Sequence, residues 1–306
     1  MMSILQKTLN EVGFDNVFTE VIHSETLGLI NPNDLRLFCL NVSSNMFKFD
    51  DLHELLLDNI GRYIFSRAKI DNFYVEKQEQ KIALKALEIL RKSAKYNSCF
   101  LGDELGDILL YIFLEKVLGA PKLCSKLETL AHGNSISIKS GVHLLPLDED
   151  LPSYQMVFGA SNIVGDVKDA IDNAFSTIKS LKTESPNEGQ LVENLIFAQS
   201  FDHFTIKKLK ENILPDGRPK PPIDRAFGVF LGYKLGLDPT KRSNLDFRNA
   251  LKAKMELDVK EHIEYIKQKI KDSSLEAHSF YFYILPFNDA DLEKDSIMNA
   301  LLGGTV

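Results

Sequence analysis

Apolar residues recur at helical spacing along some segments of the chain and at strand spacing along others. The pattern predicts helices at 51–66, 76–95, 100–119, 166–182, 189–200, 246–272 and 289–302. It predicts strands at 36–44, 122–130, 135–147, 153–161, 226–235 and 279–287. Gly119, followed by Pro121, marks the end of the third of these helices.

Strands that alternate with helices favour an α/β or α+β fold with a central mixed sheet flanked by helices, rather than a bundle or a sandwich. Residues 98–182 have the order helix, three strands, helix. We expect residues 1–95 to form an N-terminal mixed α/β segment suited to partner binding. We expect residues 96–306 to form a second domain that ends in a strand-helix extension.

The composition is ordinary for a globular protein, with 44% hydrophobic and 26% charged residues in 306. A net charge of −7 argues against a protein that coats nucleic acid with its whole surface, but leaves room for a local basic patch. Three separated cysteines without a CxxC pair argue against structural zinc and favour a reducing compartment.

No segment of the sequence has the character of a targeting or membrane signal. Residues 1–16 carry charges throughout and lack the apolar run of a signal peptide. No apolar run approaches the roughly 18 residues that a membrane span needs. We therefore expect a cytoplasmic protein that does not engage the membrane.

The helix at 100–119 carries the first candidate residues for chemistry. Glu104 and Asp107 lie three residues apart and share a face, and Asp103 precedes them. Gly102 and Gly106 flank Glu104, and a glycine inside a helix costs about 1 kcal/mol relative to alanine, so two of them around one carboxylate suggest that a backbone or a ligand approaches closely there. The simpler explanation is a first helical turn in which acids are favoured by the helix dipole.

The segment "KSGVHLLPLDED" offers a second group of candidates. His143 lies between Val142 and Leu144 in a predicted strand, where a lone histidine is more often a core or edge residue than a ligand. The three acids at 148–150 are best explained as a solvated hairpin loop.

The stretch "YQMVFGASNIVGDVKDAIDNAF" at 154–175 reads as a strand followed by a helix. In many nucleases such a strand carries a carboxylate and, two residues later, a lysine. Ala160 and Asn162 occupy these two places here. The sequence contains no GxxxxGK[ST], GxGxxG, HExxH or GxSxG motif.

Several blocks in the right order resemble the HamA family, the nuclease-like subunits of the Hachiman anti-phage defence system, within the PD-(D/E)xK nuclease superfamily. They span roughly 98–300 and are "FLGDELGDILLYIFLEKVLGAPKL", "IKSGVHLL", "MVFGASNIVGDVKDAIDNAF", "DRAFGVFLGY" and "FYFYILPF". The resemblance implies a PD-(D/E)xK core within 96–306. It also implies Mg²⁺-dependent DNA cleavage together with a HamB-like superfamily-2 helicase, which engages the DNA.

Carried onto this sequence, the resemblance matches Glu104 to the helix glutamate, a metal ligand. The strand acid falls at Ser140 or His143, neither of which is a carboxylate, and the ExK pair falls at Ala160 and Asn162. Carboxylates hold the hard cation and the lysine stabilises charge, so alanine and asparagine cannot replace the pair. We therefore expect weak or no Mg²⁺ binding and a catalytically inactive chain, through either engineered or natural loss.

Three hypotheses for function remain open from the sequence. The chain is an impaired nuclease subunit of a defence complex, a non-enzymatic subunit that regulates or tethers a helicase, or, less well supported, a restriction-type endonuclease that works alone. The partner surface is expected on 1–95 or on the charged helix at 246–272, although a solvated face is the simpler explanation for that helix.

Overall fold

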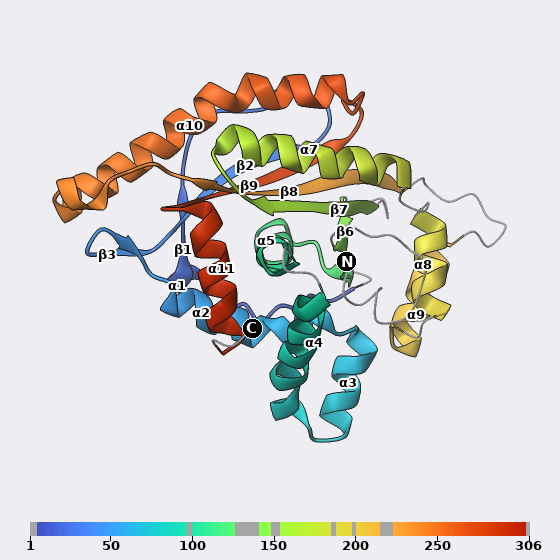
Figure 1. Ribbon diagram of the computed structural model, residues 1–306. Helices are drawn as coiled ribbons and strands as arrows, with labels where there is room; N and C mark the ends of the chain where they lie inside the picture. Colours follow the sequence, from blue (N-terminus) through green and yellow to red (C-terminus); the bar gives the residue numbers. More distant parts are fainter. Residues whose placement is uncertain are drawn as a thin grey trace.

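The computed structural model describes residues 5–96, 100–125, 141–147, 154–184, 188–197, 200–214 and 223–303. A seven-stranded sheet, in the order β1-β2-β9-β8-β7-β6-β5, runs through the centre (Figure 1). Its strands are β1 (Phe18–Val21), β2 (Asn33–Leu40), β5 (Lys122–Cys124), β6 (Val142–Pro146), β7 (Tyr154–Ile163), β8 (Asp224–Lys234) and β9 (Ser279–Phe287). A separate hairpin pairs β3 (Val42–Ser43) with β4 (Met46–Phe47).

The sheet is mixed, as predicted. Strands β2, β9, β8 and β7 are parallel neighbours, whereas β1 pairs antiparallel with β2, β6 with β7, and β5 with β6. The central strands are buried on both faces because helices cover both sides of the sheet. The predicted central mixed sheet flanked by helices is therefore confirmed.

The helices lie in layers on the two faces of the sheet. Those of the described residues are α1 (Phe14–Val17), α2 (Asp50–Ile64), α3 (Arg67–Val75), α4 (Ile82–Tyr96), α5 (Phe100–Phe113), α7 (Val167–Glu184), α8 (Glu188–Phe197), α9 (His203–Asn212), α10 (Asn244–Asp272) and α11 (Ala290–Leu301). Helices α7 and α10 cover one face, and α5 lies against the other with α2, α4 and α11 beyond it (Figure 1). Short turns of helix lie at Glu79–Lys81, Leu114–Leu118 and Pro239–Lys241.

The predicted order of the middle block is confirmed as α5, β5, β6, β7 and α7. The helix predicted over 100–119 is α-helical to Phe113, continues as a π-helical turn over Leu114–Leu118, and ends at Gly119 with φ 74°. Most of the predicted strand 122–130 and the first half of 135–147 lie outside the described residues.

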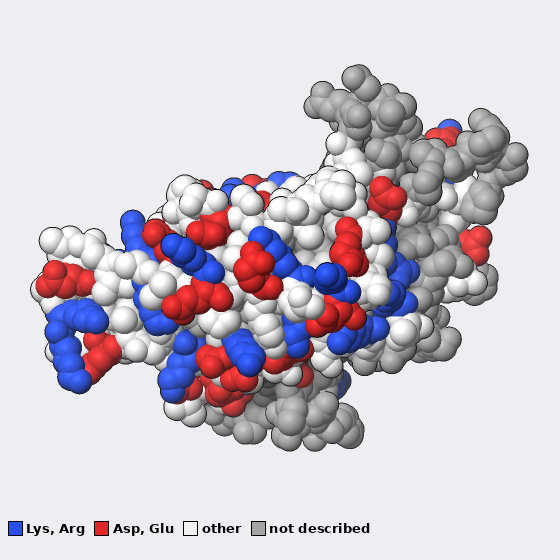
Figure 2. Space-filling model, turned by 90° about the horizontal axis from the view of Figure 1, so that it is seen from above, with Lys and Arg blue, Asp and Glu red and all other residues white. Residues whose placement is uncertain are grey.

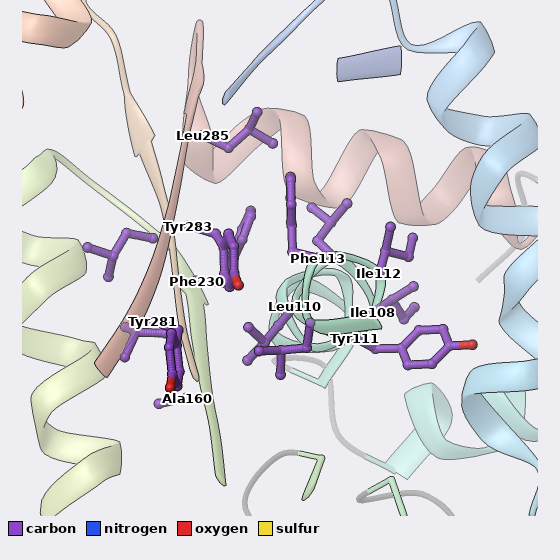
Figure 3. Close-up of a cluster of buried hydrophobic side chains, with 14 of the residues drawn as sticks. Ile108, Leu110, Tyr111, Ile112, Phe113, Ala160, Phe230, Tyr281, Tyr283 and Leu285 are labelled. Atoms are coloured by element: carbon purple, nitrogen blue, oxygen red, sulfur yellow. The ribbon is translucent and has the colours of Figure 1, made fainter. Parts of the chain in front are cut away.

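The sheet and the core extend across the predicted boundary at residue 95. Phe113 of α5 packs against Phe14, Phe18 and Phe38 from the N-terminal segment, with ring centroids 5.7, 4.9 and 4.8 Å away. The same ring stacks on Tyr283 of β9 at 5.3 Å (Figure 3). The division into two domains stays a prediction, but one sheet and one core contain residues of both segments.

A buried carboxylate ties the N-terminal segment to the end of the π-helical turn. Glu115 is fully buried and accepts hydrogen bonds from the backbone N–H groups of Thr8, Leu9 and Lys122 at 2.6, 2.7 and 2.7 Å. The Thr8 hydroxyl donates a fourth, at 2.8 Å. Hydrogen bonds to an ionised acceptor are stronger than neutral ones, so this carboxylate holds three chain segments together.

A buried lysine completes the same junction from the other side. Lys122 is 1% exposed, and its Nζ donates to the carbonyl oxygens of Arg62, Tyr63 and Phe65 at 2.8, 2.9 and 2.9 Å. These carbonyls lie at the C-terminal end of α2, where the helix has no further N–H groups to offer. The ammonium therefore caps the C-terminus of α2 and interacts favourably with the negative end of the helix dipole.

We predict that Lys122→Met lowers the free energy of unfolding by about 3 kcal/mol, because three buried carbonyls lose a charged donor. Urea denaturation measures the change. The control Lys260→Met, at an exposed lysine of α10, should stay within about 0.5 kcal/mol of wild type. Equal effects of the two substitutions would contradict this role of Lys122.

Candidate functional site

Glu104 lies in the protein interior, between α5 and α2. It is fully buried, and its Oε1 accepts a hydrogen bond from the Tyr63 hydroxyl at 2.7 Å. Burial, reinforced by the neighbouring Glu104 and Asp107 charges, raises the pKa of Tyr63 well above its ordinary value, so the tyrosine stays a donor. The predicted helix glutamate is thus part of a buried hydrogen-bonded pair.

Ala160 and Asn162 lie on the face of β7 that α7 covers. Side chains alternate along a strand, and Ser161 between them points to α5, where its hydroxyl donates to Asp107 at 2.5 Å. Asn162 donates from Nδ2 to the carbonyl oxygen of Ala170 on α7 at 2.8 Å. Ala160 is fully buried, within the hydrophobic cluster of Figure 3.

The structure confirms that the helix carrying Glu104 packs on the strand carrying Ala160, but it does not bring these two side chains into one pocket. Glu104 meets Tyr63 on the α5 side of the sheet, and Ala160 faces α7 on the other side. Ala160 and Asn162 share a face of β7. Ser140 lies outside the described residues.

The residues that the resemblance matched to a metal site do not fit a Mg²⁺ ion. Ala160 has no ligand atom, and the Glu104 carboxylate is directed to a tyrosine hydroxyl in the interior. Among the described residues, no group of three or more His, Cys, Asp or Glu side chains converges as metal ligands would. A hard cation needs several oxygen ligands, so Glu104 alone cannot provide this site.

His143 is a buried residue of β6. Its Nδ1 lies 2.8 Å from the carbonyl oxygen of Ala120, and its ring lies 6.1 Å from that of Tyr111. Burial lowers the pKa of His143 to about 4, against the charge of Glu115, which raises it. The imidazole is therefore neutral at pH 7, and it packs as a core residue.

A polar cavity of about 370 Å³ lies beside the C-terminal end of β7. It is lined by Asp103, Asp107, Ser161, Asn162, Ile163, Val164, Asn173, Ser176, Thr177 and Lys294, which come from α5, β7, α7 and α11. Of the predicted site residues, Asn162 lines this cavity, and Glu104 and Ala160 do not. The sequence indicated Asp103 and Asp107, but no sequence pattern linked Lys294 to Ile163 of β7, 131 residues earlier.

Comparison with known families gives a match over nearly the whole chain. A family model described as HamA matches residues 15–301 of 306. The chain belongs to the HamA family. Membership supports its assignment as a subunit of Hachiman antiviral defence, and it implies a partner within a defence complex.

Comparison with curated proteins gives no match. Among the described residues, no helix of this HamA-family chain has the length and apolar character to span a bilayer. The long helix α10, for example, is 29 residues long and carries charges along its length.

We predict that wild-type protein loses stability as the pH falls from 6.5 towards 4 because of His143. In the unfolded state His143 binds a proton at the ordinary histidine pKa, whereas in the folded state it does so only near pH 4. Protonation between these pH values therefore favours the unfolded state, and the contribution of the neutral His143 to the free energy of unfolding is fully present only above pH 6.5. Its loss amounts to about 3 kcal/mol. Urea denaturation across this range should show a shallower pH dependence for His143→Gln.

His203→Gln, at an exposed histidine of α9, is the matched control and should follow the wild-type curve. A His143→Gln curve parallel to that of wild type would contradict a neutral, buried imidazole.

Proposed function

We propose that this chain is a non-enzymatic subunit of a Hachiman complex. It binds a HamB-like superfamily-2 helicase and does not cleave DNA, because Ala160 and Asn162 replace the catalytic ExK pair. The observation that carries the proposal is the structural role of the side chains at these two positions. Ala160 fills a buried place in the core, and the amide of Asn162 fixes β7 to α7. Both side chains serve packing, and neither supplies charge.

The environment of Glu104 supports the same conclusion. The carboxylate accepts a hydrogen bond from Tyr63 inside the core, and its removal from that bond would cost part of the stability of α5 against α2. A ligand to a catalytic cation needs access to solvent and substrate. Mg²⁺-dependent cleavage through Glu104 would therefore require the core to open.

The charge distribution supports a division of labour in which the helicase captures DNA. Figure 2 shows acidic and basic side chains interspersed over the face that carries α10, without a basic stripe. Several of these charges are paired, as in Lys267–Glu264 at 2.7 Å, and Lys254 pairs with Asp258. A surface of this kind offers weak attraction to a phosphate backbone.

The test uses the chain in complex with the helicase, supplied with Mg²⁺ and a supercoiled plasmid. We predict co-purification of the two proteins and no nicking or linearisation beyond that of the helicase alone. Mg²⁺-dependent cleavage by the wild-type complex that Glu104→Gln abolishes would overturn the proposal. Chelation with EDTA is the control for metal dependence.

A double substitution tests whether the chain lacks only the two ExK side chains or the whole catalytic site. Ala160→Glu/Asn162→Lys restores the two residue types of the ExK pair, but the new carboxylate lies in a fully buried position that faces α7. We predict a less stable complex without cleavage. Plasmid cleavage by this variant, with the helicase and Mg²⁺ present, would show instead that the pair alone was missing.

A further inference from the structure

A second cavity, of about 240 Å³, lies where β1 and β2 form one end of the sheet. All of its lining residues fall within 20–36, in these two strands and the loop that joins them. Strands β9 and β8 separate β2 from β7 in the order of the sheet. The cavity is therefore distinct from the surroundings of Glu104, Ala160 and Asn162.

The loop between β1 and β2 is fixed by its own contacts. Leu27 is buried in the hydrophobic core, and Asn33 Nδ2 donates to two carbonyl oxygens of the loop, at 2.9 and 3.4 Å. His23 ties the start of the loop to β2, because its Nε2 lies 2.8 Å from the carbonyl oxygen of Leu35. The walls of the cavity are thus preformed, which lowers the entropic cost of binding a partner.

The charged groups of the cavity leave an excess of carboxylates. Glu20, Glu25 and Asp34 line it together with Arg36. Glu20 accepts two hydrogen bonds from the Arg36 guanidinium, from Nε to Oε1 at 2.7 Å and from Nη2 to Oε2 at 2.6 Å. This bidentate pair offsets the positive charge of Arg36 and leaves two further acids in the lining.

Asp34 is the acid whose charge is compensated least. Arg36 Nε lies 3.9 Å from its Oδ2, beyond hydrogen-bond length. Burial raises the pKa of Asp34 more than the Arg36 charge lowers it. His23 adds no cation, because its Nδ1 accepts a hydrogen bond from the backbone N–H of Glu25 and is therefore unprotonated. A second cation in the cavity would stabilise the Asp34 carboxylate.

Two isoleucines at the cavity are exposed to solvent. Ile22, which lines it, is 78% exposed, and Ile30 of the loop is fully exposed. Asn33, another lining residue, bonds to the carbonyls on both sides of Ile30, those of Leu29 and Asn31, so Ile30 lies beside the cavity. Single exposed apolar residues are common, but two beside an acid-lined cavity combine the apolar and polar contacts of a protein interface.

The size and charge of the cavity narrow the class of ligand. Small-molecule sites commonly measure about 300–1,000 Å³, so a cavity of about 240 Å³ is better suited to one long side chain. Three acids and one paired arginine repel a phosphate backbone, which argues against nucleic acid. An arginine of a protein partner fits both properties, because its guanidinium binds carboxylates through two parallel hydrogen bonds.

We infer that the β1–β2 surface, formed by Ile22, Ile30 and the acids of this cavity, docks the HamB-like helicase, with an arginine of the helicase bound to the carboxylates of Asp34 and Glu25. The inference rests on the proposed function, which supplies the partner. Proteins that capture DNA carry clustered arginines and lysines, so an acidic surface on this chain is complementary to such a partner. The partner surface expected within residues 1–95 is thereby narrowed to residues 20–36.

The test measures the affinity of the purified full chain for the helicase by biolayer interferometry, without DNA. Asp34→Asn/Glu25→Gln should weaken binding at least about tenfold, because the arginine loses both charged acceptors. The same variant should show a weaker dependence of affinity on salt concentration than wild type. Ile30→Ser should weaken binding at least about fivefold, because it removes an apolar contact beside the cavity.

Matched variants away from the β1–β2 surface are the controls. Glu256→Gln/Glu261→Gln removes two exposed carboxylates of α10, the alternative partner surface, and Leu292→Ser removes an exposed leucine of α11. Both should bind the helicase as wild type does. Hydrogen exchange provides a second readout that needs no substitution: amides of residues 20–36 should exchange more slowly in the complex than in the free chain.

Equal helicase affinities of wild type and the two β1–β2 variants, all folded by circular dichroism, would overturn the inference and leave the proposed function intact. A dimer of the chain, measured by light scattering, that Ile30→Ser converts to a monomer would also overturn it, because the surface would then bind a second copy. No binding of the helicase by wild type would overturn both ideas, whereas plasmid cleavage by the complex bears on the proposed function alone.

Discussion

Helix α5 and the turn after it are surrounded by protein, so each buried carboxylate they carry must find donors in the interior. Glu104 is met by the Tyr63 hydroxyl and Asp107 by the Ser161 hydroxyl. Glu115 is met by the backbone of the N-terminal segment and of Lys122. Because these donors come from α2, β7, β5 and the N-terminal segment, satisfying three acids fixes the position of four elements around one helix.

The same constraint decides what chemistry the centre of the molecule can perform. A carboxylate that is paired in the core stabilises the fold, and its transfer to a metal ion would leave Tyr63 as a buried hydroxyl without its acceptor. Asp107 is paired with Ser161 and, like Asp103, also lines a cavity, because Gly106 lets this turn of α5 lie close to β7. An acid enclosed in the core and acids that line a cavity thus lie within four residues of one another, and sequence spacing alone does not separate them.

Much of the fold followed from hydrophobic periodicity, because long buried helices and strands repeat the pattern many times. Short elements were missed: β1 has four residues, and α3 buries only Ile70 and Phe73, too few to show a helical stripe. The predicted helix at 76–95 begins at Ile82, after a short 3-10 turn. For the site, the close approach predicted from Gly102 and Gly106 is found at Gly106, which lies against Ser161 and Asn162 of β7. The partners Tyr63 and Lys294 could not be predicted, because tertiary contacts over 41 and 131 residues leave no local pattern.

The N-terminal segment is predicted to bind the partner, and it is attached to Glu115 by hydrogen bonds. Partner binding there would therefore affect the stability of this buried junction. Thr8 and Leu9 donate three of the four hydrogen bonds described above for the Glu115 carboxylate. A helicase that displaced Thr8 and Leu9 would leave the fully buried Glu115 carboxylate without these hydrogen-bond donors, at a cost of several kcal/mol. A partner that bound the segment in place would instead stabilise the junction that also holds Lys122 and the end of α2. A partner bound at residues 5–9 would therefore act on the turn that follows α5, the helix that carries Glu104 and Asp107, through the hydrogen bonds of Thr8 and Leu9 to Glu115.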